Sequence, residues 1–460
     1  MRIVFVQPPF KDYASKQPSL GLAYLSAVLK EKGADIFVID ANIEHLTVEE
    51  TVKRILDLNP NIVGFTISTP LLNTSLEIVR QLKSINKNLT IIAGGPHPSV
   101  MPEDVLKGID VLVRGEGEKT IEELYNHFEN SKFSLSEIKG ISYIHNNNFF
   151  HNPDRSFIDN LDEIPFPAWE YFDLGKYHGT VRKTNFNLPI LTSRGCPYGC
   201  IFCSVRTIWG RCWRPRSPKN VVDELEYLIN KFKIKEFTIL DDNFTVNPKR
   251  AIEICDLIIK RGLTIPWCPA NGIRVNTASV ELFSKMKEAG CYRLYFGVES
   301  GNQEILNKIN KQITLDQVRA AFKMAKEVGL ETTAFLMIGN LGETEETMQQ
   351  TIDFALELDP DFVQFTIATP YPGTDMYKKI KEDGRFLIKS WEDFASFKGA
   401  IFEYKDLTAN LINKMHKKAY KSFYFRSEFV FKYIKNIKSP THVKNLIYGG
   451  LTALKMITKK

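Results

Sequence analysis

A chain of 460 residues is longer than one ordinary hydrophobic core organises, so two or three domains are expected. With 43% apolar and 25% charged residues, the composition is that of a globular protein and excludes an extensively disordered chain. The net charge is only +6, and no uninterrupted apolar run is long enough to predict a membrane-spanning helix.

Residues 2 to 130 alternate short β-rich runs with amphipathic helical stretches, which predicts a parallel sheet with helices on both faces. The expected strands are Arg2–Val6, Asp35–Asp40, Ile62–Ile67, Thr90–Ala93 and Val111–Val113. The expected helices lie near Leu20–Lys32, Val48–Leu58, Leu72–Ser84 and Thr120–Phe128. Five strands in this alternation indicate a Rossmann-like or flavodoxin-like domain.

Turn-forming and polar residues follow these strands, at the sheet edge where such folds bind ligands. The first strand is followed by Gln7-Pro8-Pro9 rather than by a GxGxxG sequence, which argues against a dinucleotide. The other loops are Ser68-Thr69-Pro70, Gly94-Gly95-Pro96-His97-Pro98 and Arg114-Gly115-Glu116-Gly117-Glu118. Glycine loops are common at strand ends, and the alternative role for His97 is to cap a helix or to bond a carbonyl group.

The connection to the next domain combines a hairpin and a linker. Residues 139–151 are typical of a β-hairpin with an Asn-rich turn. Prolines interrupt residues 162–169, so this stretch cannot form a long helix. We expect the domain boundary between about residues 135 and 187, with the linker aromatics packing the two domains together.

From Leu188 onward the strand and helix alternation resumes. Five helices are expected between the strands, the clearest over Asn220–Phe232, where Ser217 and Pro218 mark the start. Six such units are too few for a closed eight-stranded barrel. The expected strands are Leu188–Ser193, Glu236–Leu240, Ile265–Ala270, Tyr292–Val298, Thr332–Ile338 and Phe362–Ala368.

Three cysteines, Cys196, Cys200 and Cys203, follow the first of these strands in a loop rich in glycine and proline. The spacing favours an iron–sulfur cluster with three protein ligands, which leaves one iron open to another molecule. A structural zinc site is the first alternative, but it needs four ligands and no second pair of cysteines follows. A disulfide is the second, disfavoured by seven cysteines in 460 residues and by a start that does not resemble a signal peptide.

With Phe202 directly before the third cysteine, this loop resembles the signature of the radical S-adenosylmethionine superfamily. The resemblance implies an open (βα)6 partial barrel and a 4Fe-4S cluster whose open iron binds the amino and carboxylate groups of S-adenosylmethionine. Reduction of the cluster then cleaves the sulfonium bond and gives a 5′-deoxyadenosyl radical.

Polar and glycine residues at the other strand ends of this domain suit a cationic ligand with a ribose and an adenine. The resemblance implies that Glu299 binds the ribose or amino end and that the backbone around Gly339 pairs with the adenine. For any one residue the alternative is a helix cap or a buried ion pair. The candidates are Phe202, Asp242, Asn243, Arg274, Glu299, Ser300 and Gly339. Cys255, Cys268 and Cys291 are expected in the core, and no role is assigned to Cys212.

The N-terminal loops, together with the stretch from Pro18 to Leu25, resemble the cobalamin-binding domain of one large class of this superfamily. They lack the Asp-x-His-x-x-Gly sequence that ligates cobalt in other cobalamin proteins. The resemblance therefore implies a base-off corrin without a protein histidine beneath it. The candidate cobalamin residues are Pro8, Gly21, Ser68, Thr69, Gly94, Gly95, His97, Gly115, Glu116 and Gly117.

The basic charge of the chain is concentrated in its tail. Residues 411–460 carry a net charge of +11, whereas the first 410 residues carry −5. Lysines alternate with aromatic and aliphatic residues, which is typical of a basic amphipathic helix on an anionic membrane surface. The equal alternative is a helical cap on the open barrel, and nucleic acid binding is not expected because no recognition module accompanies the charge.

These features predict an α/β enzyme with a cobalamin-binding domain over residues 1–137, a hairpin and linker over 138–187, a radical S-adenosylmethionine core over 188–410 and the basic tail over 411–460. The resemblance favours methyl transfer from cobalamin to an unactivated carbon of a small-molecule or lipid substrate. Ring formation or rearrangement with the same cofactors is the alternative, and a non-catalytic cluster or zinc protein is the remote one. We expect a cytoplasmic enzyme with a flavodoxin or ferredoxin as reductant, and the basic tail adds peripheral binding to the inner membrane surface as an alternative location.

Overall fold

The N-terminal domain is built on a sheet whose strand order is β2-β1-β3-β4-β5-β6-β7 in the computed structural model, which describes residues 1–10, 17–146, 148–177, 183–184, 186–395, 398–427 and 429. The first five strands are parallel and have the flavodoxin-like order. They are β1 (Arg2–Gln7), β2 (Asp35–Asp40), β3 (Ile62–Thr66), β4 (Thr90–Gly94) and β5 (Val111–Val113).

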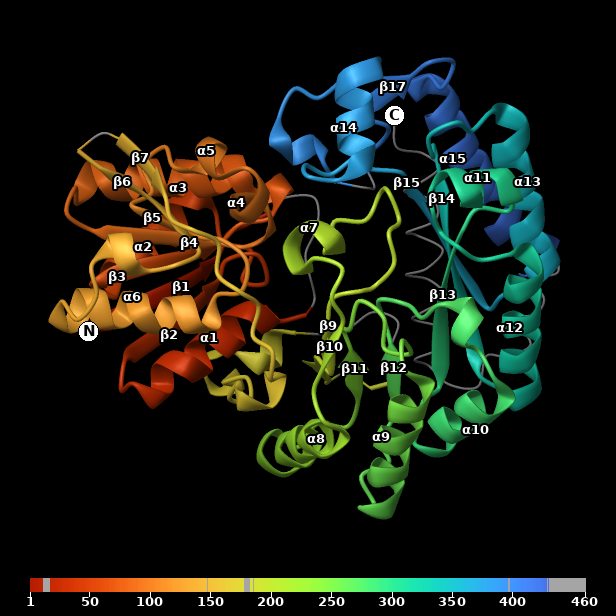
Figure 1. The fold of residues 1–460 in the computed structure, drawn as a ribbon, viewed down its shortest axis with the longest axis horizontal. Helices are drawn as coiled ribbons and strands as arrows, with labels where there is room; N and C mark the ends of the chain where they lie inside the picture. The colour runs from red at the N-terminus through yellow and green to blue at the C-terminus, as the bar shows by residue number, and fades with distance from the viewer. Residues whose placement is uncertain are drawn as a thin grey trace.

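Helices cover both faces of this sheet (Figure 1), and the strands are apolar on both sides because both are buried. Ile3 and Phe5 pack toward α1 and α6, whereas Val4 and Val6 pack toward α2 and α3. A capping box between Thr47 and Glu50 starts α2. The helices are α1 (Leu20–Glu31), α2 (Val48–Asp57), α3 (Leu72–Ile85), α4 (Pro96–Val100), α5 (Pro102–Val105) and α6 (Glu118–Asn130), with the short turn η1 (Thr69–Leu71).

The predicted hairpin forms, but it belongs to the N-terminal sheet rather than to the connection. Strand β6 (Ile141–His145) pairs antiparallel with β5, and β7 (Asn148–His151) pairs with β6. The physical reason is burial: β5 has only three residues, and the apolar side chains of Ile141 and Tyr143 complete the core beside it. The sheet therefore extends past residue 137, to residue 151.

The linker contains only short 3-10 turns among its described residues, as its prolines predict. The turns are η3 (Leu161–Glu163), η4 (Trp169–Tyr171) and η5 (Leu174–Lys176), with η2 (Leu135–Glu137) before the hairpin. Trp169 is fully buried. Glu170 accepts from Lys30 of the N-terminal domain and from Lys231 of the central domain. Among the linker aromatics, Phe166 packs against Tyr227 of the central domain and Tyr177 donates to Asp40 of the N-terminal domain, so the linker contacts both domains.

The central domain arranges six parallel strands in sequence order, each followed by at least one helix. Strands β8, β11 and β12 form one sheet, and β13, β14 and β15 form the next, with single bridges from Trp267 to Cys291 and from Ile273 to Phe296 between them. Within the described residues, β8 and β15 are the edge strands. The strands are β8 (Leu188–Ile190), β11 (Phe237–Ile239), β12 (Trp267–Pro269), β13 (Arg293–Glu299), β14 (Glu331–Ile338) and β15 (Phe362–Ile367).

The outer helices of this domain are those predicted from the alternation, with short additions. The first expected strand, residues 188–193, ends early at Ile190, because Thr192 and Ser193 turn to bond Asp241. Ser193 and Arg194 then form β9, which pairs with β10 (Arg214–Pro215). The helices are α7 (Val205–Trp209), α8 (Pro218–Phe232), α9 (Pro248–Lys260), α10 (Val280–Glu288), α11 (Gln303–Lys308), α12 (Leu315–Val328) and α13 (Glu345–Leu358), with η6 (Val275–Thr277).

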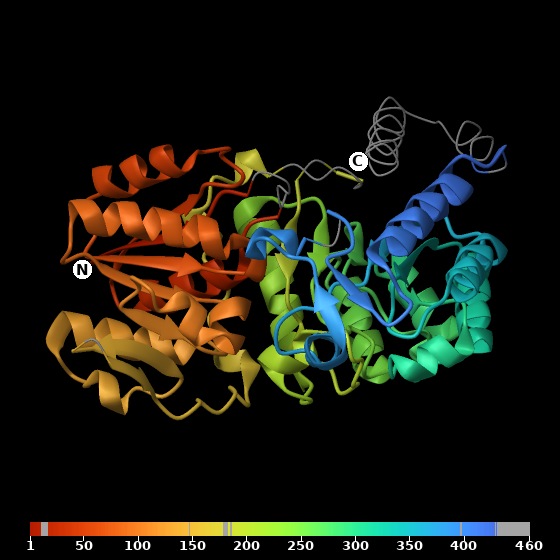
Figure 2. The ribbon, with the colours of Figure 1, turned by 90° about the horizontal axis from the view of Figure 1, so that it is seen from above.

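Helix α15 (Ala409–Tyr424) lies on the central domain, on the side away from the N-terminal domain (Figure 2), whereas the segment around η7 (Trp391–Asp393) contacts the N-terminal domain through Asn73 and His97. Helix α15 buries Ile412, Met415 and Phe423, and His416 and Tyr420 bond the carbonyl oxygen of Phe365 in β15. The start of the basic tail is thus a helical cap, and residues 428 and 430–460 lie outside the described residues. The other elements are α14 (Asp375–Asp383), β16 (Gly384–Phe386) and β17 (Phe402–Tyr404). No helix among the described residues is long and apolar enough to span a membrane.

Candidate cofactor sites

The three cysteines of the motif lie close together in the loop between β9 and α7. All three are half-buried free thiols. Burial raises the pKa of Cys203 to about 12 and also raises that of Cys196, and neighbouring cysteines of the trio add to both shifts. A bound metal centre offsets this cost, because ligand thiols release their protons on binding. No three His, Cys, Asp or Glu side chains in the described part of the chain are grouped to hold a single metal ion.

Backbone contacts fix the path of this loop. Gly195 has a φ of +84°, and a Cβ there would lie 2.0 Å from the carbonyl oxygen of Cys212, so only glycine fits. The backbone N–H of Ile201 donates to the carbonyl of Ile309, at 3.1 Å. The side chain of Asn310 donates to the carbonyl of Gly199, at 2.9 Å. Phe202, the predicted aromatic of the motif, packs partly buried against the core.

Two aspartates after β11 hold the start of the loop. Asp242 accepts from the backbone N–H of Gly195 at 2.9 Å, and burial raises its pKa to about 6. Asp241, which precedes the candidates but is not one of them, accepts from Thr192 and Ser193. Asn243 is buried, and no partner for its side-chain N–H group occurs among the described residues. The candidates Asp242 and Asn243 thus lie beside the cysteine loop with hydrogen-bonding capacity to spare.

Arg274 joins this loop to the segment between α11 and α12. Its guanidinium lies 3.6 Å from the ring centroid of Tyr198, inside the cysteine motif. The same guanidinium donates to the backbone carbonyls of Lys311 and Gln312. Arg274 therefore supports the cysteine loop directly.

Glu299, at the end of β13, forms a buried ion pair, which is the alternative that the sequence analysis left open, with a partner, Lys311, that was not predicted. The Nζ of Lys311 lies 2.6 Å from Oε1 of Glu299, and both side chains are about one-tenth exposed or less. A Cβ at Gly297 would meet both charged groups within 2.8 Å, so this glycine makes room for the pair. Glu299 itself has a φ of +66°, which is a strained backbone for glutamate. One sequence signal existed: Lys311 stands beside the buried apolar residues Ile309 and Ile313.

Two other candidates are partly committed to the fold. The hydroxyl of Ser300 is buried against the hydroxyl of Thr351 in α13, at 3.1 Å. The backbone N–H of Gly339 donates to Glu343, whose pKa burial raises to about 7. Ile412 of α15 packs against Gly339, because a Cβ there would lie 3.0 Å from its side chain. The backbone N–H of Gly339 is therefore committed to Glu343.

The predicted cobalamin residues follow β1, β3, β4 and β5 at one edge of the N-terminal sheet. Gly95 has a φ of +112° and lies so close to Ile67 that a Cβ would be 2.8 Å from its carbonyl oxygen. Gly115 donates its N–H to Ser99. Gly21, by contrast, sits in α1 with open space where a Cβ would be, so nothing in the packing requires glycine there. The structure brings the strand-end candidates together, namely Pro8, Ser68, Thr69, Gly94, Gly95, His97, Gly115, Glu116 and Gly117.

His97 is fully buried, and among the described residues its ring bonds neither a helix end nor a carbonyl group. Its Nδ1 lies 3.1 Å from the hydroxyl of Thr69, and its Nε2 has no partner among the described residues. Trp391 packs edge-on against the ring, with centroids 5.0 Å apart. Burial lowers the pKa of His97 to about 4, so the imidazole is neutral at pH 7.

His97 is expected to make the fold sensitive to acid. The unfolded chain binds a proton near pH 6.5, whereas the folded chain binds it only near pH 4. Stability that is complete above pH 6.5 is therefore lost as the pH falls toward 4, by at most about 3 kcal/mol. We expect His97→Gln to flatten the dependence of the urea midpoint on pH between 7 and 5. His145→Gln, at an exposed position, is the control, and an unchanged slope for His97→Gln would contradict the assignment.

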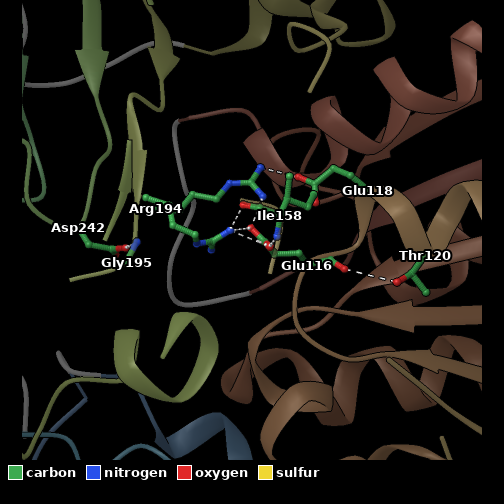
Figure 3. A network of polar contacts seen from close by, with 8 residues as sticks. Glu116, Glu118, Thr120, Ile158, Arg194, Gly195 and Asp242 are labelled. Atoms are coloured by element: carbon green, nitrogen blue, oxygen red, sulfur yellow. Dashed lines mark hydrogen bonds and ion pairs between the residues drawn. The ribbon is translucent and has the colours of Figure 1, made fainter. Parts of the chain in front are cut away.

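The two sets of candidates meet at a buried network of charges (Figure 3). Arg194, two residues before Cys196, contacts Glu116 at 2.7 Å and Glu118 at 2.5 Å. Arg214 donates to the same Glu116, whose carboxylate also accepts from the backbone of Ile158. The carboxylate of Glu116 is thus committed to the contact between the domains. If Glu116 contacts cobalamin, the contact comes from its backbone.

Two protein-family models match the chain, one in each domain. Residues 190–355 match the model of the radical SAM superfamily, and residues 10–125 match that of the B12 binding domain. The chain is 38% identical to an uncharacterized methyltransferase of Pyrococcus horikoshii over 94% of each protein. It belongs to the cobalamin-binding radical S-adenosylmethionine enzymes. The cofactors predicted from the sequence, a 4Fe-4S cluster, S-adenosylmethionine and cobalamin, are thereby confirmed.

Two further similarities bear on the activity and the fold of this radical S-adenosylmethionine enzyme. It is 30% identical to the anaerobic magnesium-protoporphyrin IX monomethyl ester cyclase of Rubrivivax gelatinosus, over 83% of this chain and 70% of the relative. Its fold matches that of the cobalamin-dependent S-adenosylmethionine radical enzyme OxsB with a TM-score of 0.77 at 20% identity, over 99% of this chain and 71% of that one. The α/β architecture expected from the sequence is thus confirmed.

Proposed function

We propose that the enzyme transfers a methyl group to an unactivated carbon of a small molecule. The observation that carries this proposal is the direct contact between the two cofactor loops, where Glu116 and Glu118 of one domain bind Arg194 of the other. Two reactive groups must reach one carbon atom in methyl transfer, so their carriers must face each other. The 38% identical methyltransferase supports this choice.

In this proposal Cys196, Cys200 and Cys203 hold the cluster, and Asp242 and Glu299 pair with the charged and ribose groups of S-adenosylmethionine. The hydrogen bond from Gly195 to Asp242, beside the cysteine loop, supports the first of these two roles. When bound, cobalamin carries the methyl group and the reduced cluster supplies the electron that cleaves S-adenosylmethionine. The protein orients these groups and excludes water. Helix α15 contributes by covering the end of β14 at Gly339.

The second candidate is oxidative ring formation or rearrangement with the same cofactors. The 30% identical cyclase favours it. The two reactions differ in how they use S-adenosylmethionine, because only methyl transfer consumes a molecule to reload cobalamin. S-adenosylhomocysteine is therefore the product that separates them.

A single-turnover experiment tests the proposal without knowledge of the substrate. We expect the anaerobically reconstituted enzyme, with cobalamin and a reductant, to form about one S-adenosylhomocysteine per bound cobalamin. Methyl-labelled S-adenosylmethionine should transfer its label to the enzyme-bound corrin. Enzyme reconstituted without cobalamin is the control. Formation of 5′-deoxyadenosine without any S-adenosylhomocysteine would favour the cyclase function instead.

We propose a reducing cytoplasm as the compartment and a flavodoxin or ferredoxin as the electron donor, because the motif thiols must stay reduced. We further propose that the tail contacts anionic lipid, which would suit a lipid or isoprenoid substrate. The net charge of +11 over residues 411–460 supports this, although residues 409–424 already cap the barrel.

The lipid contact has a direct test. We expect the full chain to co-sediment with phosphatidylserine vesicles at low salt and to be released at high salt. A variant that ends after residue 427 keeps α15 and is expected to stay in the supernatant. Equal sedimentation of the two chains would contradict the proposal.

A further inference from the structure

Four charged side chains are buried together where the domains meet, and their charges balance. Glu116 comes from the loop after β5 and Glu118 is the first residue of α6, whereas Arg194 and Arg214 come from the paired strands β9 and β10. Each side chain is at most one-tenth exposed. Removing one partner of such a buried pair leaves the other charge uncompensated, so the group tolerates little displacement.

Arg194 is the arginine of this group that contacts both glutamates. By contrast, Nε and Nη2 of Arg214 have no partner among the described residues. The guanidinium of Arg194 also lies 5.4 Å from the ring centroid of Tyr24 in α1 and 5.4 Å from that of Trp209 in α7. Arg194 is therefore held by both domains at once.

The backbone between Arg194 and the cluster loop is short and conformationally constrained. The next residue, Gly195, donates its N–H to Asp242 and passes close to Cys212 with a φ of +84°. Cys196 follows directly. A shift of the Arg194 backbone must therefore move the first cluster cysteine or break the Gly195 to Asp242 hydrogen bond, which Figure 3 shows beside the network.

The link on the other side is equally short. Glu116 and Glu118 flank Gly117, and Gly115 precedes them with a φ of +72° and its N–H bonded to Ser99. A Cβ at Gly117 would lie 3.0 Å from Leu25 of α1, so this loop is packed closely against the domain. The candidate cobalamin glycines Gly115 and Gly117 are thus neighbours of the carboxylates that Arg194 binds.

We propose that Arg194 is a positioning residue that sets the separation between cobalamin and the iron–sulfur cluster. Its ion pairs fix the cobalamin loop to the strand that leads into the cluster motif. Arg194 is two residues from the proposed ligand Cys196, and Glu116 is one residue from the candidate cobalamin glycines. The inference rests on the proposed cluster ligands and cobalamin loop. A misplacement of about 1 Å at reacting groups can cost roughly 100-fold in rate, so a rigid connection has catalytic value.

The test measures the distance between the two cofactors rather than activity. Enzyme loaded with cob(II)alamin and reduced cluster gives two paramagnetic centres, whose separation pulsed electron paramagnetic resonance reports. We expect Arg194→Lys, which keeps the charge but loses the two-pronged contact, to shift or broaden the distance distribution. Glu118→Gln removes one ion pair and leaves Arg194 in place, and it is also expected to shift or broaden the distance distribution.

Arg293→Lys is the control, because Arg293 is also a buried arginine of the central domain and pairs with Glu331 there. It is expected to leave the distance distribution as in the unaltered enzyme. An unchanged distribution in Arg194→Lys, or in Glu118→Gln if the first variant does not fold, would overturn the proposal. The measurement needs no substrate and no methyl transfer, so a failure of the methyltransferase function appears separately, as missing S-adenosylhomocysteine.

Discussion

Replacement of Cys196, Cys200 and Cys203 by alanine is expected to remove the iron–sulfur cluster and all cleavage of S-adenosylmethionine. The loop provides three thiols close together, and the adjacent acidic and backbone groups hold it in place. We expect the visible absorption of the reconstituted cluster to disappear and 5′-deoxyadenosine formation to fall by more than about 1000-fold, because the cysteines act as one unit. Iron content, absorption and 5′-deoxyadenosine are measured on the same samples.

Cys212→Ala is the matched control for this triple variant. Cys212 is exposed and lies nine residues beyond Cys203, so its loss should leave iron content and cleavage unchanged. Cobalamin binding should survive in both variants, since its candidate residues lie in the other domain. Retention of iron by the triple variant would remove the basis of the proposed function.

Local patterns in the sequence predicted the elements that local physics decides. The alternation of short apolar runs with amphipathic helices gave the six strands of the central domain, and their observed ends lie within about three residues of those expected. The hairpin at 139–151 was predicted as an element but not as part of the N-terminal sheet. Strand pairing depends on which edge is left uncovered, here that of the three-residue β5, and no local pattern carries that information.

The candidate site also has features that neighbouring residues encode and features that depend on distant residues. The cysteine motif and the strand-end loops could be predicted, because their chemistry lies in neighbouring residues. The pairs of Lys311 with Glu299 and of Arg194 with Glu116 could not, since their members are 12 and 78 residues apart. Glu116 shows the consequence: its loop was predicted correctly as an element, but its carboxylate faces an arginine from the other domain.

Replacement of Lys311 by methionine is expected to destabilise the enzyme strongly. Its ammonium group lies 2.6 Å from Oε1 of Glu299, and the two side chains are 8% and 11% exposed. Loss of one partner leaves a buried carboxylate without its counter-charge, which costs about 3–5 kcal/mol in such pairs. The measurement is the free energy of unfolding from urea titration. The paired variant Glu299→Gln with Lys311→Met removes both charges and should recover much of that loss.

The same two positions separate a structural role from a role in binding S-adenosylmethionine. If Glu299 only neutralised Lys311, the double variant would bind S-adenosylmethionine as the unaltered enzyme does, because its fold is restored. We propose Glu299 as a ligand at the ribose or amino end, so the double variant should fold and still bind S-adenosylmethionine roughly 10- to 100-fold more weakly, as expected for loss of a charged hydrogen bond. Calorimetric titration of S-adenosylmethionine into cluster-loaded protein measures this difference. Normal affinity in a stable double variant would assign the ion pair to the fold alone.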